Sequence, residues 1–199
     1  MCIDELLEDV RKRALVDECA WSDVERAIDV ARSINDPWYR CQSLAYAAES
    51  HPKRGAALAL LDEAFGAAQQ QADINRIVKV AAWPLRVLAK VDPDRAEARL
   101  AELLETAARE PHNLRRGDAL IFVAHAVADV PALKERAIPP LIGALLAGYG
   151  WRIERLIADA AMLIREDCPQ HLTALLAAHP ENRRKRQLLR ALKQAGTEL

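Results

Sequence analysis

The chain contains few of the residues that β-sheets and long loops need. Its 199 residues include only seven glycines, two phenylalanines and three tyrosines, while alanine and leucine are abundant. Strands favour aromatic and β-branched residues, whereas alanine and leucine favour helices. The composition therefore predicts an all-α protein, and the length predicts a single domain over residues 1–199.

Segments that would place the chain in a membrane are also absent from the sequence. No run of 18 uncharged apolar residues occurs, and the acidic start MCIDELLEDV lacks the basic and then apolar order of a signal peptide. We therefore expect a cytoplasmic protein without a membrane partner.

Cysteines are few, and their spacing fits neither a disulfide framework nor a metal site. Cys2, Cys19, Cys41 and Cys168 include no Cys-x-x-Cys pair. Disulfides are uncommon in the cytosol, so the four thiols are expected to be free and mostly buried.

Motifs for catalysis are missing as well. No histidine pair has metal-ligand spacing on one helix, no glycine-rich loop follows a strand, and no serine lies in a nucleophile elbow. His125 is the one histidine placed where a base could act, but Asp118 is about two helical turns away and too far to orient its ring. We predict no catalytic residue, no metal site and no cofactor, which favours a non-enzymatic protein.

What the chain does have is a regular series of helix breakers. Ser22 and Glu25 form the Ser-x-x-Glu pattern of a capping box, predicting a helix that ends near Ile34, and Asp36-Pro37 then starts the next helix. Between the breaks, apolar residues recur with helical period. The predicted helices are 3–19, followed by pairs at 23–35 and 37–50, 53–71 and 74–91, 93–109 and 112–129, 131–147 and 151–167, and 169–178 and 181–196.

The pairs form a degenerate repeat. Their second helices begin near residues 37, 74, 112, 151 and 181, a spacing typical of two-helix repeats. Pro84 is expected to kink helix 74–91, and Pro139-Pro140 to restart the first helix of the fourth pair one turn late. Hairpins of this kind bury their apolar faces against one another. We predict a right-handed α-α superhelix, a solenoid of about five hairpins after one N-terminal helix.

One turn of the chain resembles a known repeat. Asp36-Pro37-Trp38-Tyr39-Arg40, followed by Leu44, is similar to the Asp-Pro-x-Val-Arg turn of HEAT repeats. Asp73 with Arg76 is a weaker match, and the segment 111–116 keeps an arginine but lacks the aspartate. The resemblance implies a HEAT-like domain in which Asp and Arg side chains link neighbouring repeats. TPR repeats are the nearest alternative, but their signature positions are not met and their period is shorter.

The second helix of each pair carries a line of mostly polar side chains. In 74–91 the line is Arg76, Lys79, Trp83, Arg86 and Lys90, whose spacing by three and four residues places them on one face. In a hairpin solenoid the second helices line the concave side, where extended partners bind. We call this line the stripe, and its candidate partner-binding residues are Tyr39, Gln42, Tyr46, Arg76, Lys79, Trp83, Arg86, Arg115, Asp118, Phe122, His125, Arg152, Arg155 and Arg186; the line also passes through Glu49, Lys90, Asp129, Asp159, Met162, Glu166, Arg183, Arg190 and Lys193.

Charge suggests that the stripe is one surface. Eleven of its members are basic and five are acidic, a net charge of +6, whereas the whole chain carries −1. Such a face should attract an anionic partner. Tyr46, Trp83 and Phe122 recur at one stripe position, and aromatic side chains among basic ones can stack on bases or hold an acidic peptide. An ordinary solvated helix face is the competing interpretation, because without the last helix the stripe carries only +2.

The sequence therefore leaves several functions open. The favoured one is a scaffold whose concave face holds an acidic or extended protein partner. The alternative is a nucleic-acid-binding protein, possibly similar to the HEAT-like DNA glycosylases, with Asp118 or Asp159 as the acting carboxylate and Trp83 and Phe122 as stacking groups. Chaperoning, or lyase activity toward a bulky ligand, has no specific residue in its favour. HEAT-like families include scaffolds, glycosylases and pigment lyases, so the resemblance implies no single activity. Trp38 and Trp151 are interpreted as packing residues between hairpins.

Overall fold

The computed structural model describes residues 3–197, and these residues form eleven helices and no strand. The all-α prediction is confirmed, and most helix bounds lie within three residues of the predicted ones. The helices are α1 (Ile3–Cys19), α2 (Val24–Arg32), α3 (Pro37–Ser50), α4 (Arg54–Ala68), α5 (Ile74–Val91), α6 (Pro93–Ala108), α7 (Asn113–Ala126), α8 (Pro131–Leu146), α9 (Trp151–Ile164), α10 (Pro169–Ala178) and α11 (Arg183–Gln194).

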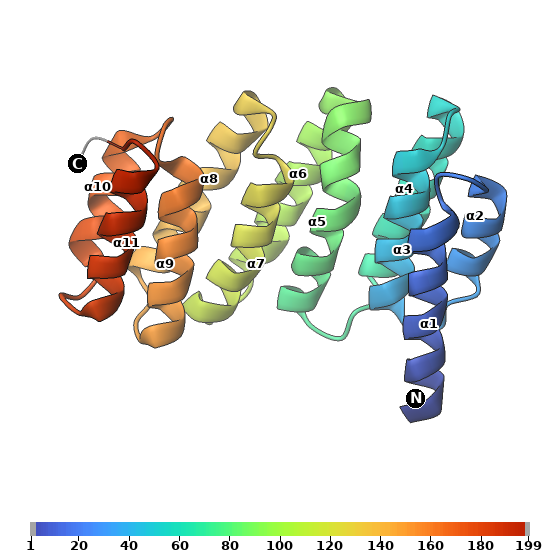
Figure 1. Ribbon diagram of the computed structural model, residues 1–199, viewed down its shortest axis with the longest axis horizontal. Helices are drawn as coiled ribbons and strands as arrows, with labels where there is room; N and C mark the ends of the chain where they lie inside the picture. The colour runs from blue at the N-terminus through green and yellow to red at the C-terminus, as the bar shows by residue number, and fades with distance from the viewer. Residues whose placement is uncertain (1–2, 198–199) are drawn as a thin grey trace.

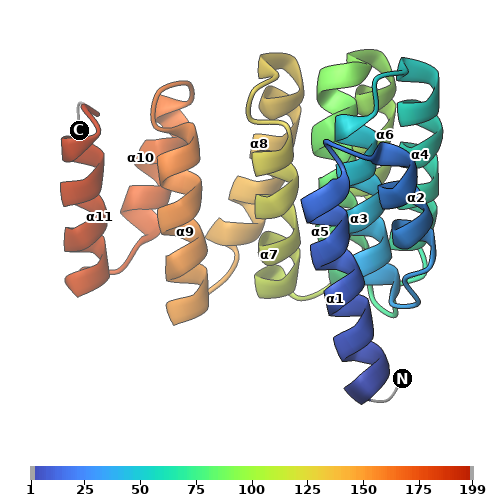
Figure 2. The ribbon, with the colours of Figure 1, turned by 45° about the vertical axis from the view of Figure 1, so that its right-hand side comes forward.

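The helices lie in two layers (Figures 1 and 2). Helices α1, α3, α5, α7, α9 and α11 form the front layer of Figure 1, and α2, α4, α6, α8 and α10 lie behind them. The front helices all begin at the lower edge of that view, which we call the N-terminal edge. The arrangement is compatible with a helical repeat, and it places the stripe residues on helices of one layer, except Asp129 and Glu166, which lie in the turns after α7 and α9.

Aspartates start several of the helices. The Asp36 carboxylate accepts a hydrogen bond from the Trp38 backbone N–H at 2.8 Å, and that of Asp73 accepts one from the Arg76 N–H at 3.0 Å. Side chains that accept from the first free N–H groups of a helix favour its beginning at that point. Asp36 and Asp73, which lie at breaks in the helical pattern of the sequence, are therefore N-terminal helix caps.

The capping box predicted at Ser22 is wrong. Asp23 is the cap of α2, because its carboxylate accepts from the Arg26 N–H at 3.2 Å. The Ser22 hydroxyl instead donates to the Cys19 carbonyl at 3.3 Å, which closes the turn after α1. The helix also ends at Arg32, two residues before the predicted end.

The predicted late restart at Pro139-Pro140 is wrong as well. Helix α8 begins at Pro131 and continues through both prolines. A proline removes the N–H that would bond the carbonyl four residues earlier. Pro139, Pro140 and the two residues that supply those carbonyls, Glu135 and Arg136, are all exposed, so water can replace the lost bonds.

Helix α5 also continues past a proline, in this case a buried one. Pro84 has no N–H to donate to the Val80 carbonyl. The Cys41 thiol of α3 lies 3.5 Å from that carbonyl oxygen and donates to it. Burial raises the pKa of the Cys41 thiol, so it stays protonated and keeps the hydrogen that this bond requires.

Three of the four cysteines lie in the described residues, and all three are free. Cys19 and Cys41 are buried and Cys168 is partly buried, as predicted, whereas Cys2 lies outside the described residues. None of the described helices combines the length and the low charge that crossing a bilayer needs.

Side chains link neighbouring repeats on both layers. At the back, Arg32 pairs with Glu63 at 2.7 Å, and Arg95 pairs with Asp62 at 2.9 Å. Arg136 pairs with Glu97 one repeat further along. On the front layer, Arg115 of α7 donates to Asp73, the cap of α5, at 2.7 Å. In the turn that carries the resemblance, Asp36 caps α3 and Arg40 bonds Gln70.

Candidate partner-binding face

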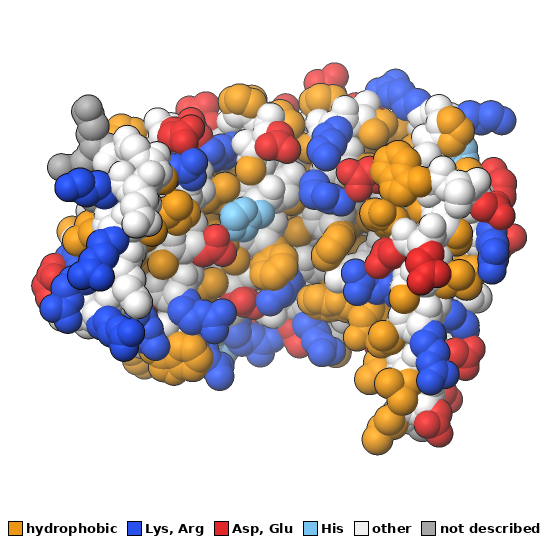
Figure 3. Space-filling model, in the orientation of Figure 1, with side chains coloured by type: hydrophobic (Ala, Val, Ile, Leu, Met, Phe, Trp, Pro, Cys, Tyr) orange, Lys and Arg blue, Asp and Glu red, His pale blue; other side chains and the backbone are white. Residues whose placement is uncertain are grey.

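The front layer presents a mixed surface. Lys and Arg side chains, carboxylates and hydrophobic groups alternate over it, and basic side chains gather along the N-terminal edge from α7 to α11 (Figure 3). Gln42 lies in the interior, only 8% exposed, so this member of the stripe is not available to a partner in the described structure. Tyr39 and Tyr46 are half-buried on α3.

Carboxylates compensate part of the positive charge at the centre of the stripe. Lys79 of α5 pairs with Asp118 of α7 at 2.9 Å. Arg86 and Lys90 both pair with Glu49 of α3, at 2.7 and 3.4 Å. Because these groups are partly exposed, each pair contributes only about 0 to 1 kcal/mol to stability. The compensation over α3 and α5 is partial, because Arg86 and Lys90 share one carboxylate.

Positive charge without an internal partner lies instead near the C-terminal end of the layer. Arg115 is held by Asp73 and by the buried Glu110, at 2.7 and 3.3 Å. Within residues 3–197 no ion pair forms at seven other basic members of the stripe, six of which belong to α9 and α11. These seven are Arg76, Arg152, Arg155, Arg183, Arg186, Arg190 and Lys193.

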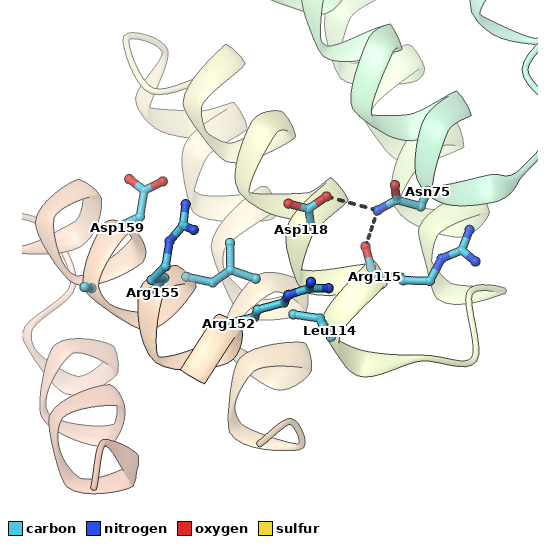
Figure 4. A pocket seen from close by; sticks show the side chains of 9 residues that line it. Asn75, Leu114, Arg115, Asp118, Arg152, Arg155 and Asp159 are labelled. Carbon is cyan, nitrogen blue, oxygen red and sulfur yellow. Dashed lines mark hydrogen bonds between the residues drawn. The ribbon is translucent and has the colours of Figure 1, made fainter. Parts of the chain in front are cut away.

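Two of these arginines line a groove of about 520 Å³ between the first turns of α5, α7 and α9 (Figure 4). Arg152 and Arg155 come from α9, and Leu114, Leu156 and Ala158 supply apolar surface. Arg115, Asp118 and Asp159 complete the lining together with Asn75. We call this site the α7–α9 groove.

The polar groups on the α5 side of the groove are held in place. The Asn75 amide donates to the Arg115 carbonyl at 2.6 Å and approaches the Asp118 carboxylate at 3.4 Å. Asp118 is also the partner of Lys79, so its charge is compensated. The groups left to meet a ligand are the two α9 guanidinium groups and the apolar surface beside them.

An exposed aromatic side chain lies next to these arginines. The guanidinium carbons of Arg152, Arg155 and Arg184 lie 5.4, 5.9 and 5.7 Å from the centre of a Trp151 ring. Trp151 is 50% exposed, and its contact on the next hairpin is with the Arg184 side chain. The preceding turn passes through Gly150, whose φ of 92° favours glycine, and leaves Tyr149 93% exposed. Trp38, by contrast, packs against the core as predicted.

A smaller apolar pocket lies further along α7. Trp83 and Phe122 form it with Ala82, Ala126, Arg86 and His125, and its volume is about 200 Å³. Lys79 lies over the Phe122 ring at 4.3 Å, and Arg86 lies 5.8 Å from the Trp83 ring. Tyr46 does not line this pocket; its hydroxyl accepts a hydrogen bond from the indole of Trp21 at 3.1 Å.

The structure supplies a partner for His125 that the sequence argument missed. Its Nε2 lies 2.9 Å from Oδ1 of Asp159, on the next front-layer helix. Helical spacing relates a histidine only to carboxylates on its own helix, whereas Asp159 belongs to the stripe on α9. Both side chains are 49% exposed, so the pair is an open surface contact.

A second groove, of about 510 Å³, contains Cys168, Lys134, Asp167 and His171. Burial and the neighbouring Asp167 charge raise the pKa of the Cys168 thiol, which makes it a weaker nucleophile than an ordinary cysteine at neutral pH. Among residues 3–197 no group of three or more His, Cys, Asp and Glu side chains could hold a metal ion.

No protein-family model, curated protein or solved structure matches this chain. The binding role of the stripe therefore stays a prediction, and the function has to be argued from the groove and its surroundings.

Proposed function

We propose that this chain is a HEAT-like repeat module, a right-handed superhelix of hairpins, that binds an acidic segment of a partner protein on its front layer. The observation that carries the proposal is the pair Arg152 and Arg155, which line a groove beside the apolar surface of Leu114, Leu156 and Ala158 and form no ion pair within residues 3–197. Guanidinium groups bind carboxylates with directed hydrogen bonds, and an apolar floor favours a segment that also carries hydrophobic side chains.

The neighbouring aromatic pocket extends this recognition. Phe122 and Leu114 are eight residues apart on α7, a distance of about 12 Å along the helix. An extended peptide covers that distance with about four residues. We therefore expect the partner to place one hydrophobic side chain between Trp83 and Phe122, and acidic residues about four positions away, at the groove.

The charge distribution favours a peptide over a nucleic acid. A phosphate backbone carries negative charge at every nucleotide and needs a continuous basic track. Here Lys79, Arg86 and Lys90 are already paired with carboxylates.

Fluorescence anisotropy with a labelled peptide composed of glutamate and leucine tests the proposal. The double variant Arg152→Glu, Arg155→Glu is compared with the matched variant Arg190→Glu, Lys193→Glu, which changes the net charge equally outside the groove. Removing the groove arginines should weaken peptide binding by about tenfold or more. The control variant should lose much less affinity, because its changed charges are distant from the groove and screened by salt.

Two results would contradict the proposal. Equal losses in both double variants would show that only net charge matters. Stronger binding of a single-stranded oligonucleotide, with a steep dependence on salt, would instead favour the nucleic-acid function.

A further inference from the structure

The first turns of α1 carry an exposed apolar row. Ile3, Leu7 and Val10 are 78%, 49% and 40% exposed, and their spacing by four and three residues places them on one side of the helix. This end of α1 extends beyond the N-terminal edge in two views of the molecule (Figures 1 and 2). A contiguous apolar row on a protruding helix end is typical of a surface that another protein covers.

The same turns are acidic. Residues 3–10 include Asp4, Glu5, Glu8 and Asp9 and contain no lysine or arginine. Asp9 is buried, so the exposed acidic positions lie beside the apolar row. The chain thus carries, at one end, an acidic and apolar helical segment of the chemistry that suits the α7–α9 groove.

The two surfaces match in pattern as well as in charge. Asp4 and Glu8 are one helical turn apart, as are Ile3 and Leu7 on the adjacent side of α1. Glu8 also pairs with Lys12 at 2.9 Å, an exposed contact worth about 0 to 1 kcal/mol that a guanidinium group of the groove can replace. In the groove, Arg152 and Arg155 are also one turn apart, and Leu114 and Leu156 lie beside them. A helix laid in the groove can therefore bring carboxylates to guanidinium groups and leucine to leucine at the same time.

We propose that the first turns of α1 of one copy bind in the α7–α9 groove of a second copy. The inference rests on the function proposed for that groove and names one of its partners. In Figure 1, α1 lies near one end of the long axis, and α7 and α9 lie toward the other. A pair of copies held by one such contact still has one free α1 and one free groove. The association is therefore head-to-tail and forms chains of copies rather than closed pairs.

Opposite charge at the two ends guides this association. The chain as a whole carries −1, so no large net charge keeps copies apart. Among the described residues, six of the seven stripe cations without an ion pair belong to α9 and α11, and the acidic first turns belong to α1. A contact made by a few helical turns belongs to the weak class of interfaces and depends on salt.

Analytical ultracentrifugation of the full chain over about 10 to 500 µM protein, a range suited to a weak contact, measures the association. Three samples carry the test: an α1 variant with Asp4→Lys and Leu7→Lys, a groove variant with Arg152→Glu and Arg155→Glu, and an equal mixture of the two. The wild type should grow beyond two copies, and each variant alone should lose at least tenfold in association constant. The mixture should form pairs and nothing larger, because it offers one intact α1 and one intact groove per pair.

The matched controls make the same kinds of charge reversal at positions outside the first turns of α1 and outside the α7–α9 groove. Glu18→Lys on α1, and Arg190→Glu with Lys193→Glu on α11, should weaken association much less than the α1 and groove variants, because they change only distant, screened charge. A wild type that stays a single copy over the whole range would overturn the inference. Variants that associate as strongly as the wild type, or a mixture that fails to form pairs, would overturn it too.

The α1 variant separates this inference from the proposed function. It keeps an intact groove, so it should bind the glutamate and leucine peptide while remaining a single copy. If the peptide binds and the wild type does not associate, only the inference fails. If the wild type associates through the groove and the peptide does not bind, the proposed recognition of acidic partner segments fails instead.

Discussion

Asp9 holds the N-terminal helix to the rest of the front layer. Its carboxylate is fully buried and accepts hydrogen bonds from two backbone N–H groups, of Asn35 at 3.1 Å and of Asp36 at 2.8 Å. These groups belong to the turn between α2 and α3, in which Asp36 in turn caps α3. The Asp9 carboxylate therefore stabilises this turn and also holds α1 against it.

Replacing this carboxylate should destabilise the fold. Asp9→Ala leaves two N–H groups without acceptors in a buried site, and losing charge-assisted hydrogen bonds of this kind costs about 2 to 4 kcal/mol. Urea unfolding followed by circular dichroism measures the free energy of unfolding. Asp29→Ala, at an exposed position of α2, is the matched control and should change it by less than about 0.5 kcal/mol. A cost for Asp9→Ala as small as that of the control would show that the two hydrogen bonds do not matter.

Single residues were the hardest part to predict from the sequence. A Ser-x-x-Glu pattern predicted the cap one residue too early because Ser22 and Asp23 both suit that position, and only the path of the chain decides between them. The pairs His125 with Asp159 and Lys79 with Asp118 join residues on different helices. Their geometry depends on how neighbouring helices pack, and the spacing of residues within one helix carries no information about that packing.

At the scale of whole helices, α5 continues past Pro84 with the help of a hydrogen-bond donor on α3. The Val80 carbonyl that Pro84 leaves without a backbone donor accepts from the Cys41 thiol of α3. The sequence predicted a kink at Pro84, but it offered no means of seeing that the thiol lies beside this carbonyl. The observed helix runs from Ile74 to Val91 without a break in its assignment.

This contact makes the effects of two substitutions interdependent. Cys41→Ala should destabilise the wild type because it removes both the donor and buried volume. In a Pro84→Ala background residue 84 regains a backbone N–H that can donate to the Val80 carbonyl, so the thiol is no longer needed as a donor. The cost of Cys41→Ala should then fall by about 1 kcal/mol, measured as a double-mutant cycle of urea unfolding. Additive effects would mean that the thiol contributes packing alone.

Helix positions, in contrast, followed directly from local sequence. Asp36, Asp73 and Asp92 begin helices in the structure as they do in the sequence pattern, because capping and proline geometry are local properties. Pro139 and Pro140 misled the prediction for the opposite reason. Whether a proline interrupts a helix depends on whether water or a neighbour can bond the freed carbonyls, and that depends on burial.

At the scale of the molecule, the sequence predicted a layer of parallel second helices but not its charge pattern. Summed along the stripe, the charges predicted a net basic face to which the last helix contributes most, but not which of the charges pair. Stacking brings Glu49 to Arg86 and Asp118 to Lys79, which leaves unpaired cations mainly on α9 and α11. A partner is therefore expected to meet different chemistry at the two ends of the molecule.

Burial also differs along the stack, and stability should follow it. Helix α5 contributes nine buried residues, whereas α10 and α11 contribute two each. In a stack of repeats each helix is stabilised mainly by its neighbours, so a terminal hairpin with little buried surface opens most easily. Native-state hydrogen exchange should therefore show amides of α11 opening at a free energy about 2 to 5 kcal/mol below that of α5.

A substitution within the last hairpin tests whether this opening is local. Leu192 is fully buried, and Leu192→Ala should remove most of the remaining protection of α11 amides. Protection in α3 and α5 should hardly change, since these helices do not contact α11. Protection that is equal along the whole chain, or that falls everywhere in Leu192→Ala, would mean that the chain unfolds as one cooperative unit. Local opening would instead let α11, with its four unpaired basic side chains Arg183, Arg186, Arg190 and Lys193, adjust to a partner while α5 and α7 keep the aromatic pocket in place.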